Sequence, residues 1–174
     1  GHEVIEMGFA KLYRQTGDPR WIALAKFFLD CRGTGNEYSQ NHKPVVEQRE
    51  AVGHAVRANY LYSGMADVAA LTGDARYLAA ITAIWENVVS KKLHLTGGCG
   101  ARAAGEAYGD NYELPNRCYN ETCAAVAFLF WNHRMFLMTG DAKYMDVFER
   151  SLYNSVLSGV SLSGDRFFYP NPLE

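Results

Sequence analysis

The sequence predicts an all-α fold built from helical hairpins. The main observation is a motif, Thr-Gly-Asp with an aromatic residue three positions after the aspartate, which begins at Thr16, Thr72 and Thr139, spacings of 56 and 67 residues. Such spacings are typical of a helix–turn–helix unit with a variable loop. In each copy we expect the glycine to end one helix in the left-handed conformation and the aspartate to cap the next. A second observation is the helical spacing of apolar residues between the copies.

Six helices are expected from these patterns. Their predicted ranges are 3–16, 18–32, 46–72, 74–92, 120–139 and 141–159. The fourth and sixth carry an apolar stripe opposite a polar face, whereas the third and fifth are apolar almost all round and rich in alanine. We therefore expect the odd-numbered helices in an inner layer and the even-numbered helices in an outer layer. The tail SLSGDRFFYPNP predicts a short C-terminal β-hairpin that turns at Gly164 and Asp165.

Repeated hairpins with an inner and an outer layer form either a solenoid or a closed α/α ring. Three hairpins amount to about half of an (α/α)6 toroid, so residues 1–174 are interpreted as one partial α/α-toroid domain. The chain starts in helical periodicity without an initiator methionine and ends within the predicted β segment, which favours a piece of a longer protein. An isolated half-ring leaves apolar surface of the inner helices uncovered, so its self-association is one consequence to expect.

Composition and spacing argue against several classes of partner and site. The formal net charge is −2 and there are no long charge runs, so neither a nucleic-acid nor a membrane partner is expected. The longest apolar run, residues 124–131, is too short to span a bilayer. The four cysteines include no Cys-x-x-Cys pair, which excludes a self-contained zinc knuckle. Each cysteine is by default a small buried apolar residue.

Two reactive side chains open the fifth predicted helix, in the stretch YNETCAAV. Asn120 is the expected N-cap, which places Glu121 and Cys123 in the first turn. The N–H groups and dipole of a helix N-terminus favour a thiolate there. Because residues two apart do not share a helix face, the two side chains are expected to point in different directions. The alternative interpretation is a capping glutamate followed by a core cysteine.

The long glycine-rich loop at 96–116 is a second candidate region. It carries Glu106 and Glu113, and loops of this length often hold functional groups. Glu106 could complete a mixed oxygen and sulfur zinc site with Cys123, although two ligands do not by themselves make a site. Solvated loop carboxylates are the alternative.

His54, His2 and Tyr169 complete the set of candidates. If the hairpins repeat in register, the N-terminal ends of the odd-numbered helices lie on one face, which would bring His2, His54 and Glu121 together. A lone histidine in an alanine-rich helix is also typical of a hydrogen-bonded core residue. Tyr169, in FFYPNPLE, could simply pack within the predicted β-hairpin.

Several longer motifs resemble those of glycoside hydrolase family 127, which is related to families 146 and 142. The motifs are HKPVVEQREAVGHAVRANYLYSGMADVA, LTGG, GEAYGDNYELPN, ETCAA, ERSLYNSVLSG and FFYPNPLE, and the similarity runs from residue 1 to residue 174. The resemblance implies a six-hairpin α/α toroid with β-sandwich domains beyond it. It also implies a retaining β-L-arabinofuranosidase that takes a small-molecule or oligosaccharide substrate with terminal L-arabinofuranose, of plant origin.

The resemblance implies roles for individual residues as well. In the family a zinc ion is held by one glutamate and three cysteines, one of which is the nucleophile. By motif, Glu106 falls on the zinc glutamate, Cys123 on one zinc cysteine and Glu121 on the acid/base. His54, Tyr169 and His2 fall on positions that contact the sugar.

The family's adjacent Cys-Cys pair, which contains the nucleophile, is expected downstream of NPLE and therefore outside these 174 residues. The zinc site is then incomplete in this chain, and the chain alone is expected to be inactive. Two other functions remain open: an α/α-toroid sugar epimerase or unsaturated uronidase without zinc, and a non-catalytic helical repeat that binds a partner.

Overall fold

The computed structural model describes residues 2–174, and within this range it is all-helical. The α-helices are α1 (Ile5–Thr16), α2 (Pro19–Asp30), α3 (Ala55–Thr72), α4 (Ala75–Lys91), α5 (Thr122–Thr139) and α6 (Ala142–Ser151). No strand is formed between residues 2 and 174, where β pairing is limited to isolated bridges. The predicted all-α class is therefore confirmed. None of the helices in these residues combines the length and apolarity needed to cross a membrane.

The Thr-Gly-Asp motifs form the three predicted hairpin turns. Each glycine ends its helix with φ near +70°, and each aspartate accepts a hydrogen bond from the backbone N–H two residues ahead. The residues are Gly17 and Asp18, Gly73 and Asp74, and Gly140 and Asp141. One local signal therefore both ends one helix and starts its antiparallel partner.

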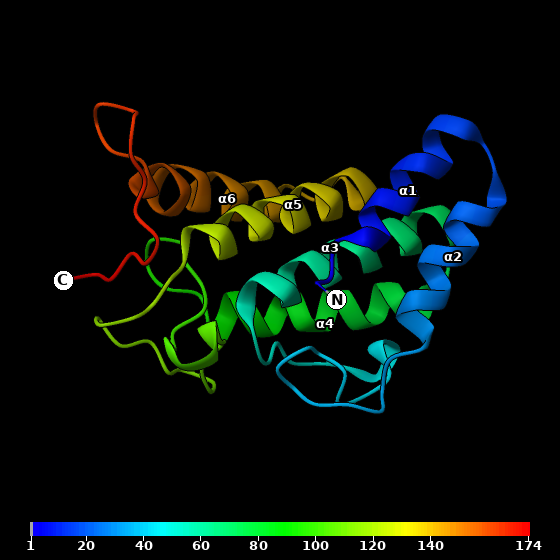
Figure 1. Cartoon of the computed structure of the whole chain (residues 1–174), viewed down its shortest axis with the longest axis horizontal. Helices are drawn as coiled ribbons and strands as arrows, with labels where there is room; N and C mark the ends of the chain where they lie inside the picture. The colour runs from blue at the N-terminus through cyan, green and yellow to red at the C-terminus, as the bar shows by residue number, and fades with distance from the viewer. Residues whose placement is uncertain (1) are drawn as a thin grey trace.

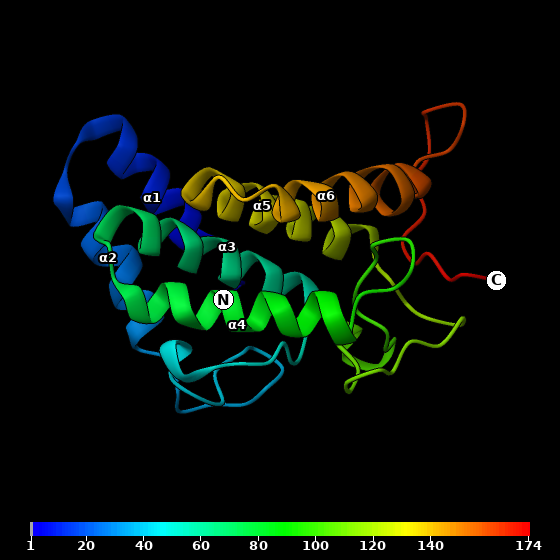
Figure 2. The same ribbon diagram turned by 180° about the vertical axis from the view of Figure 1, so that it is seen from behind.

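The hairpins stand side by side and form two layers. α3 packs against both α1 and α5. In the view of Figure 1, α4 and α6 lie behind these helices, and in Figure 2, which shows the molecule from the opposite side, α4 and α6 lie in front. Almost every residue of α3 from Ala55 to Ala69 is buried. The core between the layers contains Tyr62, Trp131, Phe128 and Met65, which are fully buried. Helices α3 and α5 are thus inside, as the sequence predicts.

Helix α3 begins nine residues later than the sequence predicts, at Ala55 in place of residue 46. Only a short 3₁₀ turn, η1 (Val45–Glu47), forms in the intervening stretch. The break lies at Gly53, whose left-handed φ of +69° does not continue a helix, and the chain there passes so close to Glu37 that a Cβ would lie 2.0 Å from its carbonyl oxygen. The chain therefore leaves helical geometry there, and His54 becomes the N-cap residue. Helix α6 also ends early, continuing as a π turn, Leu152–Val156, and a 3₁₀ turn, Leu157–Gly159.

The predicted C-terminal β-hairpin is wrong. One isolated bridge joins Val160 to Phe167 around the turn at Gly164, and no strand forms in the described chain. Leu162 and Phe167 are exposed, so no apolar face packs to support a two-stranded unit. The tail pairs instead with the segment before α5, where Thr122 N–H donates to the carbonyl of Tyr169 at 3.0 Å.

We expect Gly53→Ala to destabilise the protein much more than Gly73→Ala. Both glycines have φ of +69°, but nothing lies within 4 Å of a Cβ at Gly73, while a Cβ at Gly53 would overlap the Glu37 carbonyl. The left-handed backbone alone costs about 1 kcal/mol, and the steric overlap adds roughly 1–3 kcal/mol more at Gly53. Thermal unfolding of the two variants measures the difference. Equal losses would contradict the close approach at Gly53.

Candidate functional site

The N-terminal ends of α3 and α5 carry the candidate site. His54 is the N-cap of α3, and its Nδ1 accepts from the backbone N–H of Arg57 at 3.5 Å. An accepting Nδ1 leaves the proton of a neutral imidazole on Nε2. His54 Nε2 lies 2.9 Å from Oε2 of Glu106, so the histidine donates to that carboxylate. Two residues 52 positions apart in the chain are thereby joined at the N-terminal end of α3.

The loop that carries Glu106 is pinned to the backbone just before α3. Ala107 forms bridges with both His54 and Arg102, and Tyr108 N–H donates to the Gly53 carbonyl at 2.9 Å. Glu106 ends a short 3₁₀ turn, η2 (Ala104–Glu106), with a left-handed φ of +50°. Such a conformation is unfavourable for a glutamate and persists only where its surroundings enforce it. These backbone bonds aim the Glu106 carboxylate at His54.

Tyr119 is the second partner of Glu106. Its hydroxyl donates to Oε1 of Glu106 at 3.2 Å. Desolvation, followed by the negative charges of Glu106 and Glu121, raises the pKa of Tyr119 to about 12, so the phenol stays a donor at neutral pH. Tyr119 was not among the residues predicted from the sequence. The available signal was an aromatic side chain immediately before the Asn-Glu-Thr-Cys stretch.

Glu113, the other loop carboxylate, has a structural role. It accepts from Nε of Arg102 at 2.9 Å and from the backbone N–H of Asp110 at 2.8 Å. These hydrogen bonds, with Arg102 contributing most, hold the pKa of Glu113 below its ordinary value. Glu113 therefore braces its own loop and is not brought to His54.

Glu121 occupies the N-cap position of α5, which corrects the prediction that Asn120 does so. Its backbone is extended, and its side chain makes no capping hydrogen bond although the residue is only 3% exposed. Oε2 of Glu121 is buried without a hydrogen-bond partner among the described residues. Asn120 instead adopts a left-handed φ of +40°. The Glu121 carboxylate is thus free of any role at the helix end.

Cys123 lies against the same carboxylate. Burial, then a hydrogen bond with Glu121 and its negative charge, raises the pKa of the Cys123 thiol to about 11. The expectation that Glu121 and Cys123 point in different directions stays a prediction, and the rule on which it rested does not decide this pair. Helical spacing does not apply to Glu121, because that residue precedes the first helical turn.

Tyr169 reaches the site because the tail lies along the start of α5. Glu121 forms an isolated bridge with Pro170, and the Tyr169 ring lies 6.3 Å from the Tyr119 ring. A hydrogen bond to the Glu121 carboxylate is the main cause of the raised pKa of Tyr169. Its side chain remains 45% exposed, so part of the ring faces outward.

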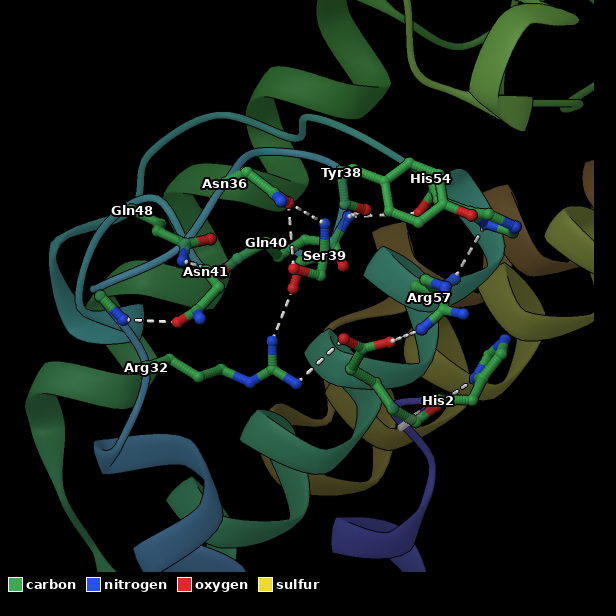
Figure 3. A network of polar contacts seen from close by, with 12 residues as sticks. His2, Arg32, Asn36, Tyr38, Ser39, Gln40, Asn41, Gln48, His54 and Arg57 are labelled. Carbon is green, nitrogen blue, oxygen red and sulfur yellow. Dashed lines mark hydrogen bonds and ion pairs between the residues drawn. The ribbon is translucent and has the colours of Figure 1, made fainter.

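His2 lies on the other side of His54, and two tyrosines accompany it. The His2 ring is 6.2 Å from that of His54 and 5.9 Å from that of Tyr60, while the Tyr38 ring is 5.5 Å from His54. Figure 3 shows His2 and Tyr38 near His54 from different segments. Burial and the neighbouring Cys123 raise the pKa of Tyr60. Tyr38 and Tyr60 were not predicted, because nothing in their local sequence separates them from ordinary core aromatics.

The donors present suit a borderline-soft cation such as zinc, but they do not complete a site. A buried, unpartnered carboxylate oxygen of Glu121 next to the thiol of Cys123 supplies one oxygen and one sulfur donor. Residues 2–174 contain no group of three or more histidine, cysteine or acidic side chains that could hold a metal. Cys31 is exposed at the end of α2, and Cys99 and Cys118 are buried. The predicted zinc ligands Glu106 and Cys123 therefore stay a prediction.

A buried polar network ties these parts together at Asn59. Its Nδ2 donates to the Ala124 carbonyl at 3.1 Å, and its Oδ1 accepts from the Tyr108 hydroxyl at 2.7 Å. Cys99 Sγ lies 3.4 Å from the same Nδ2. Asn59 is fully buried. Its one amide therefore connects α3 with the first turn of α5 and with Cys99 and Tyr108, which lie before and after Glu106 in the sequence.

Known proteins resemble this chain over its whole length. A family model described as "Beta-L-arabinofuranosidase, GH127 catalytic domain" matches residues 1–174. A non-reducing end β-L-arabinofuranosidase from Bifidobacterium longum subsp. longum is 34% identical over 199 residues, which cover 100% of this chain and 30% of that protein.

Solved structures agree with the sequence comparison. A GH127 β-arabinofuranosidase is 63% identical with a TM-score of 0.96, over 99% of this chain and 28% of its own. A GH127 β-L-arabinofuranosidase from Geobacillus stearothermophilus T6 is 43% identical with a TM-score of 0.97, over 100% of this chain and 31% of its own. The chain thus spans less than a third of the length of these relatives. A sugar epimerase from a ruminal bacterium, 14% identical with a TM-score of 0.64, shares the fold alone.

We expect Asn59→Leu to destabilise the protein by about 2–4 kcal/mol, because it leaves the buried Tyr108 hydroxyl without its acceptor and removes the bond to α5. Tyr108→Phe is the matched control, because it removes one bond and leaves the bond between Asn59 and Ala124. Its expected cost is about 1–2 kcal/mol. Thermal unfolding compares the two variants, and a smaller loss for Asn59→Leu than for Tyr108→Phe would contradict the network.

Proposed function

Because the chain belongs to the GH127 β-L-arabinofuranosidase catalytic-domain family, we propose that the protein carrying it is a zinc-dependent retaining glycosidase. Its proposed substrates are small-molecule or oligosaccharide arabinosides of plant origin with terminal L-arabinofuranose. The observation that carries the proposal is the meeting of His54 with Glu106, and of Glu121 with Cys123, at the N-terminal ends of two inner helices.

The contacts favour an exchange of the roles that the sequence motifs gave to the two glutamates. Glu121 presents a buried, unpartnered oxygen next to Cys123, which suits a metal ligand. The side chain of Glu106 is 36% exposed and accepts from His54 and Tyr119. A carboxyl that must exchange a proton with a bound glycoside needs such access and such orientation. We therefore assign Glu106 as the acid/base, and Glu121 with Cys123 as the metal-binding pair.

In this proposal, Glu121 and Cys123 contribute to a zinc site whose other ligands are cysteines outside residues 1–174, one of them the nucleophile. When bound, zinc would keep its thiol ligands deprotonated near neutral pH. The negative charge of Glu121 near the Cys123 thiol supports this assignment, because it disfavours the thiolate and a bound cation would relieve that repulsion.

Glu106 acts twice in a retaining reaction. It first gives a proton to the glycosidic oxygen as the nucleophilic cysteine outside residues 1–174 bonds to the sugar and the bond to the leaving group breaks. It then accepts a proton from the water that displaces this cysteine from the sugar. His54 and Tyr119 hold the two oxygens of Glu106 during both steps. His2, Tyr38 and Tyr169 surround this position from three other segments and are proposed to contact the sugar.

The two assignments of the glutamates are separable in the full-length protein. We expect Glu121→Gln to lose at least about tenfold in zinc affinity. We expect Glu106→Gln to keep its zinc and to lose roughly 10²- to 10⁴-fold in kcat/KM on an arabinoside with a poor leaving group. Metal analysis and kinetics on both variants measure this. Zinc loss in Glu106→Gln with full occupancy in Glu121→Gln would restore the assignment from the motifs.

Zinc dependence gives a further expectation. Dialysis of the full-length protein against a chelator should abolish hydrolysis of an aryl β-L-arabinofuranoside, and added zinc should restore it. The 174-residue chain should show no turnover, because two ligands with water bind zinc more weakly than a closed four-ligand site. Chelator-insensitive activity would instead favour a zinc-free sugar epimerase or uronidase, and turnover by the short chain would refute a nucleophile outside it.

A further inference from the structure

Gln40 is a fully buried amide in the loop before α3, with a left-handed φ of +54°. Its Nε2 donates to the Tyr38 carbonyl at 3.0 Å, the Val52 carbonyl at 2.9 Å and the His54 carbonyl at 3.3 Å. Figure 3 shows Gln40, Tyr38 and His54 gathered in this loop. The Gln40 side chain therefore binds one carbonyl in its own loop, that of Tyr38, and two carbonyls just before α3, those of Val52 and His54.

We propose that Gln40 is a positioning residue that sets the orientation of His54 and, through it, of the Glu106 carboxylate. The proposal rests on the function proposed above for Glu106. It makes Gln40 a determinant of the rate of proton transfer, although Gln40 makes no hydrogen bond to Glu106 or Glu121.

The amide of Gln40 acts on the backbone at His54 alongside two other contacts, the bridge from His54 to Ala107 and the hydrogen bond from the Ala58 N–H to the His54 carbonyl at 3.0 Å. His54 is an N-cap with extended φ and ψ, so its own N–H lies outside the helical ladder. That N–H donates to the Tyr38 carbonyl at 3.1 Å, which is one of the carbonyls that Gln40 binds. Gly53 fits against the Glu37 carbonyl only because it has no Cβ. The loop at residues 37–40 and the N-cap of α3 are thus in close contact, and the Gln40 side chain donates to carbonyl groups of both.

The imidazole of His54 transmits this backbone position to Glu106. The distance between Nε2 and Oε2 is 2.9 Å, close to the best length for a charge-assisted hydrogen bond. Glu106 has a strained backbone and only one other described side-chain hydrogen bond, from Tyr119. A tilt of the His54 backbone would therefore lengthen one of the two bonds that aim the acid/base.

Gln48 provides a matched control in the same loop. It is 1% exposed, and its Nε2 donates to the Gln40 carbonyl at 2.8 Å and to the Lys43 carbonyl at 2.9 Å. It has the same chemistry and the same burial, but it donates to no carbonyl of residues 52–54. Loss of its amide should weaken the loop without releasing the N-cap of α3.

The test compares Gln40→Met with Gln48→Met in the full-length protein, because methionine keeps the shape of glutamine and removes the amide. For an arabinoside with a poor leaving group, we expect Gln40→Met to lower kcat roughly ten- to a hundredfold with little change in KM. For an aryl arabinoside with a good leaving group, which needs less proton donation, the loss should be several-fold smaller. Gln48→Met should lose comparable thermal stability and keep kcat within about threefold on both substrates.

A purely structural role for Gln40 predicts a different pattern. Equal losses of kcat on the two substrates, or equal losses in the two variants, would overturn the proposal. Zinc content should match the wild-type protein in both variants, and its loss in Gln40→Met would also overturn it.

Hydrogen exchange tests whether Gln40 holds the backbone at His54, and it needs no measurement of activity. Peptides that cover residues 52–58 should exchange faster in Gln40→Met than in the wild-type protein and in Gln48→Met, because Gln40 no longer holds the Tyr38 carbonyl that accepts from the His54 N–H. Unchanged exchange in Gln40→Met overturns the proposal. A wild-type protein that does not hydrolyse arabinosides would refute the proposed function, and the exchange result would still decide whether Gln40 holds His54.

Discussion

The close approach of α3 and α5 is the constraint on which the site depends. Both helices carry small, almost fully buried residues, among them Ala58 and Ala66 on α3 and Ala124 and Ala127 on α5, and small side chains let two helix backbones lie near each other. The amide of Asn59 then spans the gap to the α5 backbone. Because a helix is rigid, fixing this contact also fixes where the two N-termini emerge. A larger side chain there would move Glu121 and His54 apart.

Two groups of ion pairs, one around Asp67 and one around Glu3, connect the inner helices and their flanking segments. Asp67 of α3, almost fully buried, binds Arg14 of α1 and Arg134 of α5, each at 2.8 Å. Glu3 binds Arg32 at 3.0 Å and Arg57 at 3.4 Å. A buried carboxylate that lost its partners would be strongly destabilising, so these pairs favour one arrangement of the helices over others.

The fold itself leaves the chemistry open. A sugar epimerase at 14% identity shares this helical arrangement, so the layers and hairpins do not distinguish hydrolysis from epimerisation. The chemistry must therefore come from individual side chains placed on this fold. Here the N-termini of α3 and α5 carry His54 and Glu121 as N-cap residues that are not held by ordinary helix geometry. Their side chains are therefore oriented by loops, and loops can vary between proteins while the helical fold stays the same.

The existence of six helices, their Thr-Gly-Asp turns and the inner position of α3 and α5 could be predicted from the sequence, because capping and apolar periodicity act within a few residues. The sequence also picked out Glu106, Glu121, Cys123 and His54 as chemically notable. It did not determine that Glu121 contacts Cys123, or that Glu106 faces His54. Those pairings depend on the left-handed turn at Glu106, the break at Gly53 and the tail that runs along the start of α5. Such contacts join residues tens of positions apart, so they arise from the packing of the folded chain and leave no local pattern in the sequence.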